Sequence, residues 1–402
     1  MLGRVSIAAT AHQSPTPLST TRLAWLDALR GIGAMAVVAE HLMPWLLPSL
    51  RPYWFSLGAF GILLFFLVSG YIIPTSLERH GDVRKFWISR AFRLYPLYLA
   101  VIVLVVGMAW WVPVREQVQR DGSAVAAHAT MLLDVVSVGG LADTMWTLSY
   151  EMVFYLLVTA LFVTGQHMRS GLLAMLFGAV AVIAGLVLSR AVLVGEWLSY
   201  VSAAVFVAGL ACVISGRFRT AGAYALGLLA VTLVVLGSRV PWLGVAVLAA
   251  MFAGTAIHRW ERGTGPLWPV AVTAALIAVA PVWAPQAGWW WVQPDVWITT
   301  IALVAVTFAG GMAMRGRRVP RVLTWLGLIS YSLYLVHHPL LKFFGQVTGD
   351  LRESPLPVQL SMAAVAVTLI LLASALTYRF IEKPAQNWGR RFTRPQPGAT
   401  PS

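Results

Sequence analysis

The sequence predicts an all-α fold, a polytopic transmembrane helical bundle. Of its 402 residues 59% are hydrophobic and 11% are charged, and the mean hydropathy is +0.76. Soluble globular domains carry about 25% charged residues, so this composition excludes a soluble enzyme, a disordered protein and a disulfide scaffold. Apolar runs of roughly 18–21 residues recur along the chain, which is the length needed to cross a bilayer. They are too long and too continuously apolar for barrel strands, so the spans are helices.

Twelve windows meet this requirement: 23–43, 57–77, 94–112, 145–164, 171–189, 197–215, 221–238, 240–257, 267–284, 296–314, 322–341 and 359–380. Residues 1–21 lack an apolar core of signal-peptide length and contain Pro15 and Pro17, which predicts a disordered cytoplasmic tail. The membrane domain is expected over residues 22–388. Residues 389–402, rich in Pro, Gly and Arg, are expected to form a second disordered tail.

Positive charge sets the predicted orientation. The net charge is +14, and with twelve spans and a cytoplasmic start 21 Lys and Arg fall inside and seven outside. Merging the two windows that Ser238 and Arg239 separate would move the last eleven of the inside set outside, against the positive-inside rule. The prediction is therefore a multi-pass protein of a cell membrane with about 10–12 spans and both termini cytoplasmic. The arginines lie between apolar runs rather than along one face, so no nucleic-acid partner is predicted. Cys212 is the single cysteine, which excludes an internal disulfide and a Cys-based metal site.

The first window carries ionisable residues, which are costly in a span and mark functional sites. Arg30 and His41 are eleven residues apart, which places them within about 20° of one helix face and about 16 Å apart in height. Asp27 lies one turn before Arg30 and can neutralise it. Glu40 faces elsewhere. For His41 alone, a polar contact between helices is the alternative to a catalytic role.

Two further clusters favour the catalytic alternative. Trp146, Ser149 and Glu151 open the fourth window. In the eleventh window, Ser330, Tyr334 and His337 share one face. Histidine titrates near neutral pH, and an imidazole held by a carboxylate is suited to general-base chemistry on a hydroxyl. A metal site built from His41, His337 and Glu151 is a less favoured alternative, and no metal is predicted.

Arg90 and Arg93 begin the third window beside Arg84 and Lys85. They fit either an ordinary positive flank or a clamp for phosphates, which guanidinium groups bind in a bidentate manner. Gly70, at the end of the stretch Phe65–Gly70, would allow a ligand or a helix to approach closely. Trp289, Trp290 and Trp291 fit an interfacial aromatic belt, with substrate stacking as the less favoured alternative.

Six stretches in order along the chain resemble the bacterial integral-membrane acyltransferase 3 family. They are LDALRG (26–31) followed by His41, FFLVSG (65–70), RAFRLYP (90–96), WTLSYE (146–151) with Phe154 and Tyr155, ISYSLYLVH (329–337) and FIEKP (380–384). Two departures from the family pattern are visible. The family commonly has a second acid where this chain has Met152, and its usual core has nearer ten spans than twelve.

The resemblance implies O-acylation of a hydroxyl by an acyl-CoA, acetyl-CoA or another short-chain thioester. It assigns Arg30 and His41 as paired residues of the first span, Arg90 and Arg93 as donor-side arginines and Glu151 as an active-site acid. We expect binding or orienting roles for seven further residues: Asp27, Trp146, Ser149, Tyr155, Ser330, Tyr334 and His337. The acceptor is expected to be a surface polysaccharide or other glycan, or a glycosylated small molecule of macrolide type. Membrane lipids surround the chain, and no oligomeric state is predicted.

A transporter or flippase is the competing function, because such proteins also place charges near the bilayer midplane. The pairing of Arg30 with His41 has no counterpart in the second half of the chain, so the inverted repeat typical of many transporters is not evident.

Overall fold

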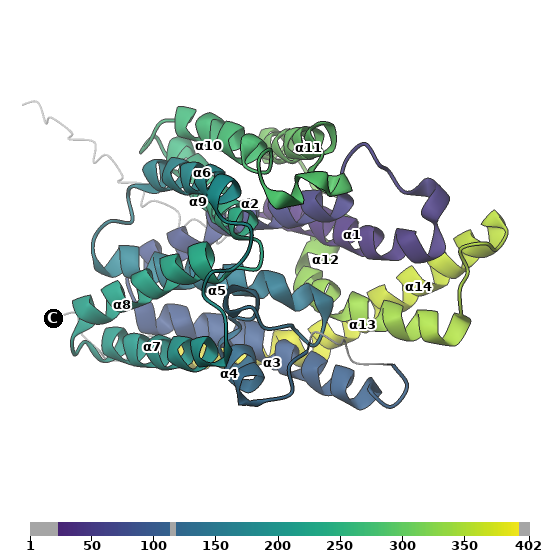
Figure 1. Cartoon of the computed structure of the whole chain (residues 1–402), viewed down its shortest axis with the longest axis horizontal. Coiled ribbons are helices and arrows are strands. Elements are labelled where there is room, and N and C mark those ends of the chain that lie inside the picture. The colour runs from purple at the N-terminus through teal and green to yellow at the C-terminus, as the bar shows by residue number, and fades with distance from the viewer. Residues whose placement is uncertain (1–22, 113–117, 394–402) are drawn as a thin grey trace, which may run out of the picture.

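The computed structural model describes residues 23–112 and 118–393, and every regular element in them is helical (Figure 1). The α-helices are α1 (Ala24–Leu46), α2 (Leu57–His80), α3 (Val83–Met108), α4 (Gly122–Thr130), α5 (Trp146–Val163), α6 (Ser170–Val187), α7 (Glu196–Ser215), α8 (Arg219–Thr232), α9 (Pro241–Glu261), α10 (Trp268–Val279), α11 (Pro294–Ala313), α12 (Arg321–Leu328), α13 (Ser330–Thr348), α14 (Leu356–Thr377) and α15 (Lys383–Thr393). A π-helical turn at Leu233–Gly237 extends α8, and another at Tyr378–Glu382 joins α14 to α15. The predicted all-α class is confirmed.

Nine helices in the described residues are long and apolar enough to cross a membrane: α2, α3, α5, α6, α7, α8, α9, α11 and α14. Helices α1 and α13 have 23 and 19 residues but fall outside this set because of their polar side chains. Window 267–284 differs from expectation, since α10 has only 12 residues. Window 322–341 is broken at Ile329 into α12 and α13. The count by length and composition is thus below the predicted 10–12.

Two boundaries differ from the prediction. Helix α3 begins at Val83 rather than near residue 94, so the arginines expected at its flank lie inside the helix. Helix α15 continues to Thr393, so residues 389–393, predicted to be disordered, are helical. The reason is aromatic packing, because the rings of Trp388 and Phe392 lie 5.6 and 5.7 Å from that of Phe92 on α3. Residues 1–21 and 394–402 lie outside the described part of the chain.

The helices run between two ends of the bundle. Contacts near the helix ends and their connecting segments identify each of them. At one, which we call the Arg259 end, Arg259 of α9 bonds Glu78 of α2 at 2.5 Å and the carbonyl of His167 between α5 and α6 at 2.7 Å. At the other, the Arg51 end, the backbone N–H of Val192 donates to the carbonyl of Leu236 over 2.7 Å. Successive long helices therefore run in alternating directions between the ends, as membrane crossings require.

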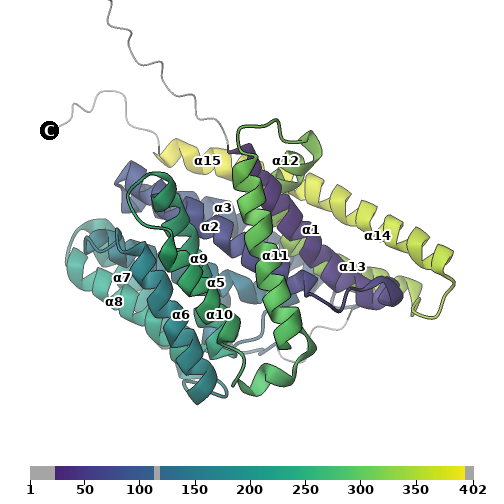
Figure 2. The same ribbon diagram turned by 90° about the horizontal axis from the view of Figure 1, so that it is seen from above.

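The helices form a flattened array (Figure 2). Helices α7 and α8 lie at one side and α13 and α14 at the other, while α2, α3, α5 and α9 lie between them (Figure 2). The short helices α12 and α15 cover one end (Figure 2). Contacts join α1 to α2, α12 and α13, so α1 lies against the helices that carry the polar motifs.

An irregular segment, 131–145, lies almost entirely buried before α5. Backbone without regular helix is tolerated at membrane depth only where protein covers it. The backbone N–H of Asp134 donates to the Ser149 hydroxyl at 3.0 Å, and the Asp134 carboxylate accepts from the Tyr150 hydroxyl at 2.5 Å. These contacts fix the segment against the first turn of α5.

Candidate functional site

The structure brings together two histidines that the sequence singled out, His41 of α1 and His337 of α13. The His337 Nε2 lies 3.2 Å from the His41 Nδ1, and the ring centroids are 5.1 Å apart. Each Nδ1 also lies 2.9 Å from the backbone carbonyl four residues earlier, that of Val37 or Leu333. His337 is fully buried and His41 is partly buried, so His41 faces the protein interior rather than lipid.

These contacts assign the ring protons. His337 Nδ1 carries hydrogen because its near partner is the Leu333 carbonyl, an acceptor, which leaves its Nε2 as an acceptor toward His41. His41 Nδ1 then carries hydrogen as well, and the lone pair of His41 remains on Nε2. Among the described residues that Nε2 has no hydrogen-bond partner. The pair therefore presents one basic nitrogen.

The imidazole of His338 and the carboxylate of Asp143 lie next to this pair, and the sequence did not predict either. We call His41, His337, His338 and Asp143 the histidine cluster. The His338 ring meets the His41 ring edge-on with centroids 5.2 Å apart. The His338 Nε2 lies 3.6 Å from Asp143, which belongs to the buried irregular segment. For His338 the only signal in the sequence was its position directly after His337. No local pattern marks Asp143.

Arg90 and Arg93, the two arginines that the resemblance assigns to the donor side, lie on α3, and side chains of α3 meet side chains of α5 in antiparallel order. The Trp87 indole N–H donates to the Thr159 hydroxyl at 3.0 Å. About one turn further along, the Arg90 guanidinium carbon lies 5.5 Å from the ring centroid of Tyr155, and Arg93 interacts electrostatically with Glu151. Helical periodicity alone puts residues three or four apart on one face, so both motifs meet along a single helix pair.

Arg90 is buried, with 8% of its surface exposed, and is not an ordinary positive flank. Its guanidinium carbon lies 5.2 Å from the Phe86 ring centroid as well as near Tyr155. Its Nε is buried without a hydrogen-bond partner in the described residues. A buried N–H that lacks a partner is costly, and such a donor is suited to bind a ligand anion.

Arg30 of α1 lies near Arg93 and Glu151. We call Arg30, Arg90 and Arg93, with the acids around them, the arginine cluster. Arg30 interacts electrostatically with Arg93, Asp27, Glu382 and Glu151, and its guanidinium carbon lies 5.2 Å from the Phe65 ring centroid. The predicted neutralisation of Arg30 by Asp27 is thus shared with carboxylates from α5 and from the turn after α14.

Glu382 is a member of this arginine cluster that sequence reasoning did not select. The carboxyl group is buried, accepts from the Ser332 hydroxyl at 2.8 Å and accepts from the Gln386 amide at 3.0 Å. It lies in the π-helical turn Tyr378–Glu382, a kind of irregularity that is frequent at functional sites. Its place in the FIEKP stretch was the available signal.

A cavity of about 30 Å³, room for about one water molecule, separates the histidine cluster from the arginine cluster. Its lining includes Phe65, Thr147, Glu151, Tyr331 and Tyr334. Tyr334 lies 6.1 Å from His337 between ring centroids, and Glu151 accepts a hydrogen bond from the Tyr155 hydroxyl. Neither His41 nor Arg90 lines the cavity itself; each lies one side chain behind its wall.

Three predicted residues serve the surrounding structure instead of facing this cavity. The Ser149 hydroxyl holds the Asp134 backbone, the Ser330 hydroxyl donates to the Gly327 carbonyl at 2.9 Å, and the Trp146 ring packs edge-on against Tyr150. Thr147, not selected from sequence, takes the place expected for Ser149. It lies 2.7 Å from the Tyr334 hydroxyl.

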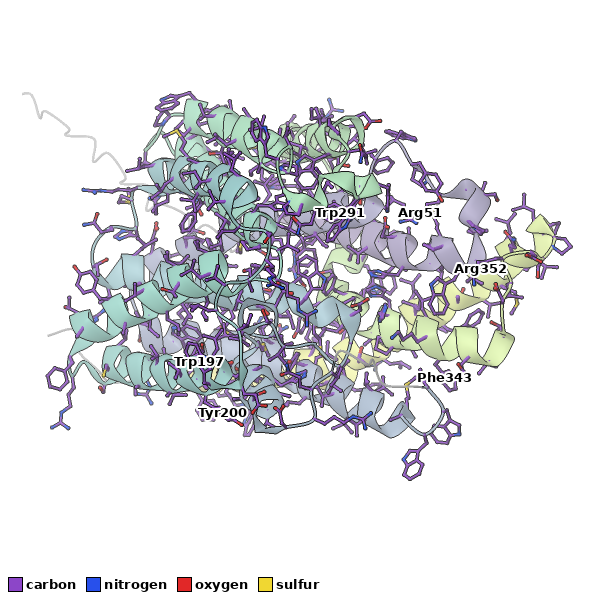
Figure 3. All side chains as sticks on the ribbon, viewed as in Figure 1. Arg51, Trp197, Tyr200, Trp291, Phe343 and Arg352 are labelled. Carbon is purple, nitrogen blue, oxygen red and sulfur yellow. The ribbon has the colours of Figure 1, made fainter. Side chains whose placement is uncertain are left out.

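The tryptophans at 289–291 contact different partners; Figure 3 labels Trp291 and Arg51. The Arg51 guanidinium carbon lies 4.5 Å from the Trp290 ring centroid and also pairs with Glu40, which explains why Glu40 does not join His41. The Trp291 ring packs against Trp242 and Trp297.

The arrangement combines a basic imidazole with a guanidinium cluster one cavity away. It can remove a proton from a hydroxyl at one point and bind an anionic group at another. No group of three or more His, Cys, Asp or Glu within residues 23–112 and 118–393 is placed to hold a metal ion.

Comparison with known proteins gives a family match over most of the chain. The acyltransferase 3 family model, described as "Acyltransferase domain", matches residues 23–378. The chain is 25% identical over 402 residues to "Putative peptidoglycan O-acetyltransferase YrhL" of Bacillus subtilis, covering 92% of this chain and 56% of that protein. It is 26% identical over 392 residues to "Putative membrane-bound transacylase BcsY" of Komagataeibacter xylinus, covering 91% and 83%.

A shorter match links the chain to "Peptidoglycan O-acetyltransferase OatA" of Listeria monocytogenes, 28% identical over 150 residues, covering 33% of this chain and 23% of that protein. The chain therefore spans about half of the Bacillus relative and less than a quarter of the Listeria relative. No solved structure matches.

Proposed function

Because this chain belongs to the acyltransferase 3 family and is a multi-pass membrane protein, we propose that it transfers a short acyl group from an acyl-CoA to a hydroxyl of a carbohydrate-containing acceptor. The observation that carries the proposal is the contact of His41 with His337 inside the bundle. Buried paired imidazoles are expensive in a membrane and are retained for chemistry.

His41 is the general base in this proposal. Its Nε2 takes the proton of the acceptor hydroxyl as the hydroxyl oxygen attacks the thioester carbonyl carbon. His337 Nε2 accepts from the His41 Nδ1–H and stabilises the imidazolium that forms. When the carbon–sulfur bond breaks, the imidazolium returns the proton to the thiolate, so the products are an O-acyl ester and free CoA thiol.

The arginine cluster is the proposed site for the donor phosphates. Arg30 and His41 are eleven residues apart on α1, about 16 Å along the helix, so a thioester on an extended arm can reach His41 while its phosphates stay near Arg30 and Arg90. Arg90 supports this because its guanidinium rests on aromatic rings and keeps a buried N–H for a ligand. The positive-inside rule supports an orientation in which the basic ends of the helices, and this cluster with them, lie toward the cytoplasm, where acyl-CoA is made.

The acceptor is proposed to be a glycan, since two relatives carry names that refer to peptidoglycan O-acetylation. A glycosylated secondary metabolite is the other acceptor class that this chemistry would accept. Both present the same reacting group, an aliphatic hydroxyl.

His41→Ala tests the proposal. The purified chain in lipid nanodiscs is supplied with acetyl-CoA and a soluble oligosaccharide, and release of free CoA thiol is measured. General-base catalysis contributes roughly 10²–10⁴-fold, so the variant is expected to lose at least 99% of the rate.

The matched control is His167→Ala, which removes a partly buried imidazole at the Arg259 end and should leave the rate unchanged. Normal thiol release by His41→Ala would refute the base assignment. A wild-type protein that binds or moves acceptor without releasing CoA thiol would instead support the transporter alternative.

A further inference from the structure

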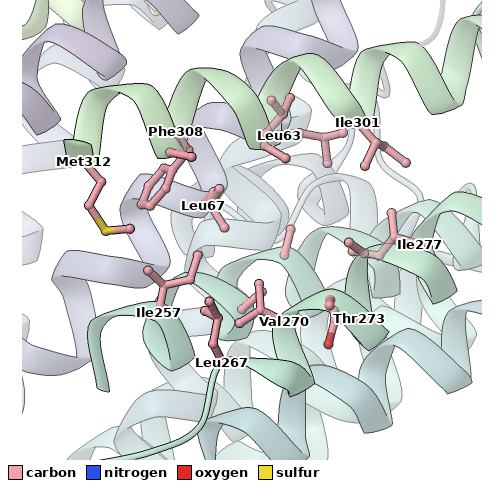
Figure 4. Close-up of a pocket in the computed structure, with 17 residues that line it drawn as sticks. Leu63, Leu67, Ile257, Leu267, Val270, Thr273, Ile277, Ile301, Phe308 and Met312 are labelled. Carbon is pink, nitrogen blue, oxygen red and sulfur yellow. The ribbon is translucent and has the colours of Figure 1, made fainter. Parts of the chain in front are cut away.

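A second cavity, far more apolar than the candidate site, lies between α2, α9, α10 and α11 (Figure 4). Its volume is about 330 Å³. Its walls are aliphatic and aromatic side chains, among them Leu63, Leu67, Ile257, Ile301 and Phe308. The hydroxyl of Thr273, which also lines it, donates to the Pro269 carbonyl at 2.7 Å and is not available to a ligand. Hydrocarbon is the chemistry that this interior accepts.

This cavity has the form of a groove, because α11 and α10 are separated along it. Helix α10 ends at Val279 after 12 residues, and small side chains face the gap from both helices, including Ala271, Ala305 and Ala309. These three alanines are exposed, so the groove is open sideways to the bilayer. An open apolar slot in a membrane protein is covered by lipid hydrocarbon.

One end of the groove leads to a charged hollow at the Arg259 end. Ala309 and Met312 line both the groove and a second hollow of about 510 Å³, to which Glu261 and Arg315 contribute. Arg315 pairs with Glu261, whose carboxylate also accepts from the Tyr71 hydroxyl. We call this charged hollow the mouth of the groove. Its acid, Glu261, is already bound to Arg315 and Tyr71.

The mouth carries a large excess of positive charge. Residues 259–262 and 315–318 together contain five arginines, of which Arg259 pairs with Glu78 and Arg315 with Glu261, so the net positive charge comes from Arg262, Arg317 and Arg318. Arg317 and Arg318 are exposed there. Trp260 and Trp268 are also exposed, which is typical of the depth at which lipid headgroups lie. An anionic headgroup fits this rim.

The groove also has the length of one leaflet. Its lining on α11 runs from Ile301 to Met312, eleven residues or about 16 Å. This is about half of the roughly 30 Å hydrocarbon core of a bilayer. An acyl chain that starts at the arginine-rich mouth would end near the midplane.

We propose that this groove binds one acyl chain of an anionic phospholipid from the surrounding membrane, with the lipid phosphate held at Arg315, Arg317 and Arg318. The site is separate from the His41 cluster and does not depend on acyl transfer. A zwitterionic lipid and the acyl chain of a long-chain acyl-CoA are the two occupants that the experiment must distinguish.

The full chain in mild detergent is incubated with phosphatidylglycerol or phosphatidylcholine of identical chains, and retained lipid is counted by native mass spectrometry. Each arginine strengthens the binding of a headgroup of net negative charge several-fold, whereas the choline of phosphatidylcholine offsets the charge of its phosphate, so we expect phosphatidylglycerol to be retained roughly tenfold better. The surface variant R317Q/R318Q should remove this preference. Equal retention of the two lipids by the wild-type chain would overturn the proposal.

The groove itself is tested with Ala305→Phe, whose ring fills the slot, and with Ala302→Phe as a matched control. Ala302 is exposed on the same helix and does not line the groove. Retained phosphatidylglycerol should fall roughly fivefold or more in the first variant only, because several methylene groups lose their burial. Unchanged retention in Ala305→Phe would contradict the site. Palmitoyl-CoA that is displaced by that substitution while phosphatidylglycerol stays would assign the groove to a donor chain instead.

Discussion

Arg90 is a charged side chain whose burial costs free energy. A buried arginine, here with 8% of its surface exposed, is costly unless its charge and its N–H groups are satisfied. Two aromatic faces compensate part of that cost, and its Nε lacks a partner among the described residues. A phosphate bound beside it would supply both the missing acceptor and the opposite charge.

Arg90→Lys therefore should weaken donor binding while leaving the base intact. Lysine keeps the charge but cannot bind a phosphate in the bidentate manner, so we expect the KM for acetyl-CoA to rise roughly tenfold with a smaller change in kcat. Thiol release at varied acetyl-CoA concentration measures both. Arg84→Lys, an exposed position one and a half turns earlier on α3, is the control and should leave KM unchanged. An equal KM for both variants would mean that Arg90 serves folding only.

Residues that share one helix were predictable, and residues that tertiary structure brings together were not. The 3.6-residue repeat is enough to place Arg30 below His41, or Ser330 on the face of His337, because no other element intervenes. Asp143 approaches His338 only through the buried segment 131–145, whose path depends on contacts with α5 and with the connection before α9. Glu382 likewise depends on where a π-helical turn ends.

At the scale of elements, close helix packing explains the stretch Phe65–Gly70. A Cβ at Gly70 would lie 1.8 Å from the Met251 carbonyl oxygen, and one at Gly254 would lie 2.1 Å from the Leu67 carbonyl oxygen. Helices α2 and α9 thus touch backbone to backbone, and the Thr255 hydroxyl donates to the Gly70 carbonyl at 2.7 Å. Of the two alternatives for Gly70, the approach of a helix is confirmed.

Gly70→Ala is expected to destabilise the bundle by roughly 1–3 kcal/mol, because backbone cannot yield to an added methyl group as a side chain can. The melting temperature in detergent, followed by tryptophan fluorescence, measures the loss. Gly107→Ala is the matched control on α3, where nothing lies within 4 Å of the new methyl group. There the change should be neutral or stabilising by about 0.5–1 kcal/mol. Equal melting temperatures for the two variants would argue against the tight contact.

Hydropathy predicted where the long helices lie but not where polar packing interrupts them. All twelve windows overlap a helix, since hydrocarbon burial and backbone satisfaction act on any sufficiently long apolar run. The break at Ile329 was not visible, because α12 crosses α1 so closely that a Cβ at Gly327 would lie 1.9 Å from the Asp27 carbonyl oxygen. That crossing directs α13 along α1 and places His337 beside His41.

At the scale of the whole molecule, the two ends differ in charge and in proposed role. The Arg259 end gathers the connection after α11, with Arg315, Arg317 and Arg318, and the start of α3, with Arg84 and Lys85. The Arg51 end receives the connection between α13 and α14, which includes Asp350 and Arg352. The arginine cluster lies nearer the first end and His41 nearer the second, because α1 runs from one to the other. In the proposed function, the acyl-CoA donor and the acceptor would then enter from opposite sides of the membrane.

This arrangement predicts a labelling pattern that depends on the orientation and on the broken crossing α12–α13. In a Cys212→Ala background, Arg317→Cys and Arg352→Cys lie at the two ends of that crossing, both at exposed positions. The positive-inside rule places Arg317 in the cytoplasm, so a membrane-impermeant maleimide added to intact cells should label only Arg352→Cys. A permeant maleimide should label both and serves as the accessibility control. Labelling of Arg317→Cys from outside would reverse the orientation, and labelling of both would mean that α12 and α13 do not form a crossing, which would remove the cytoplasmic route to Arg90.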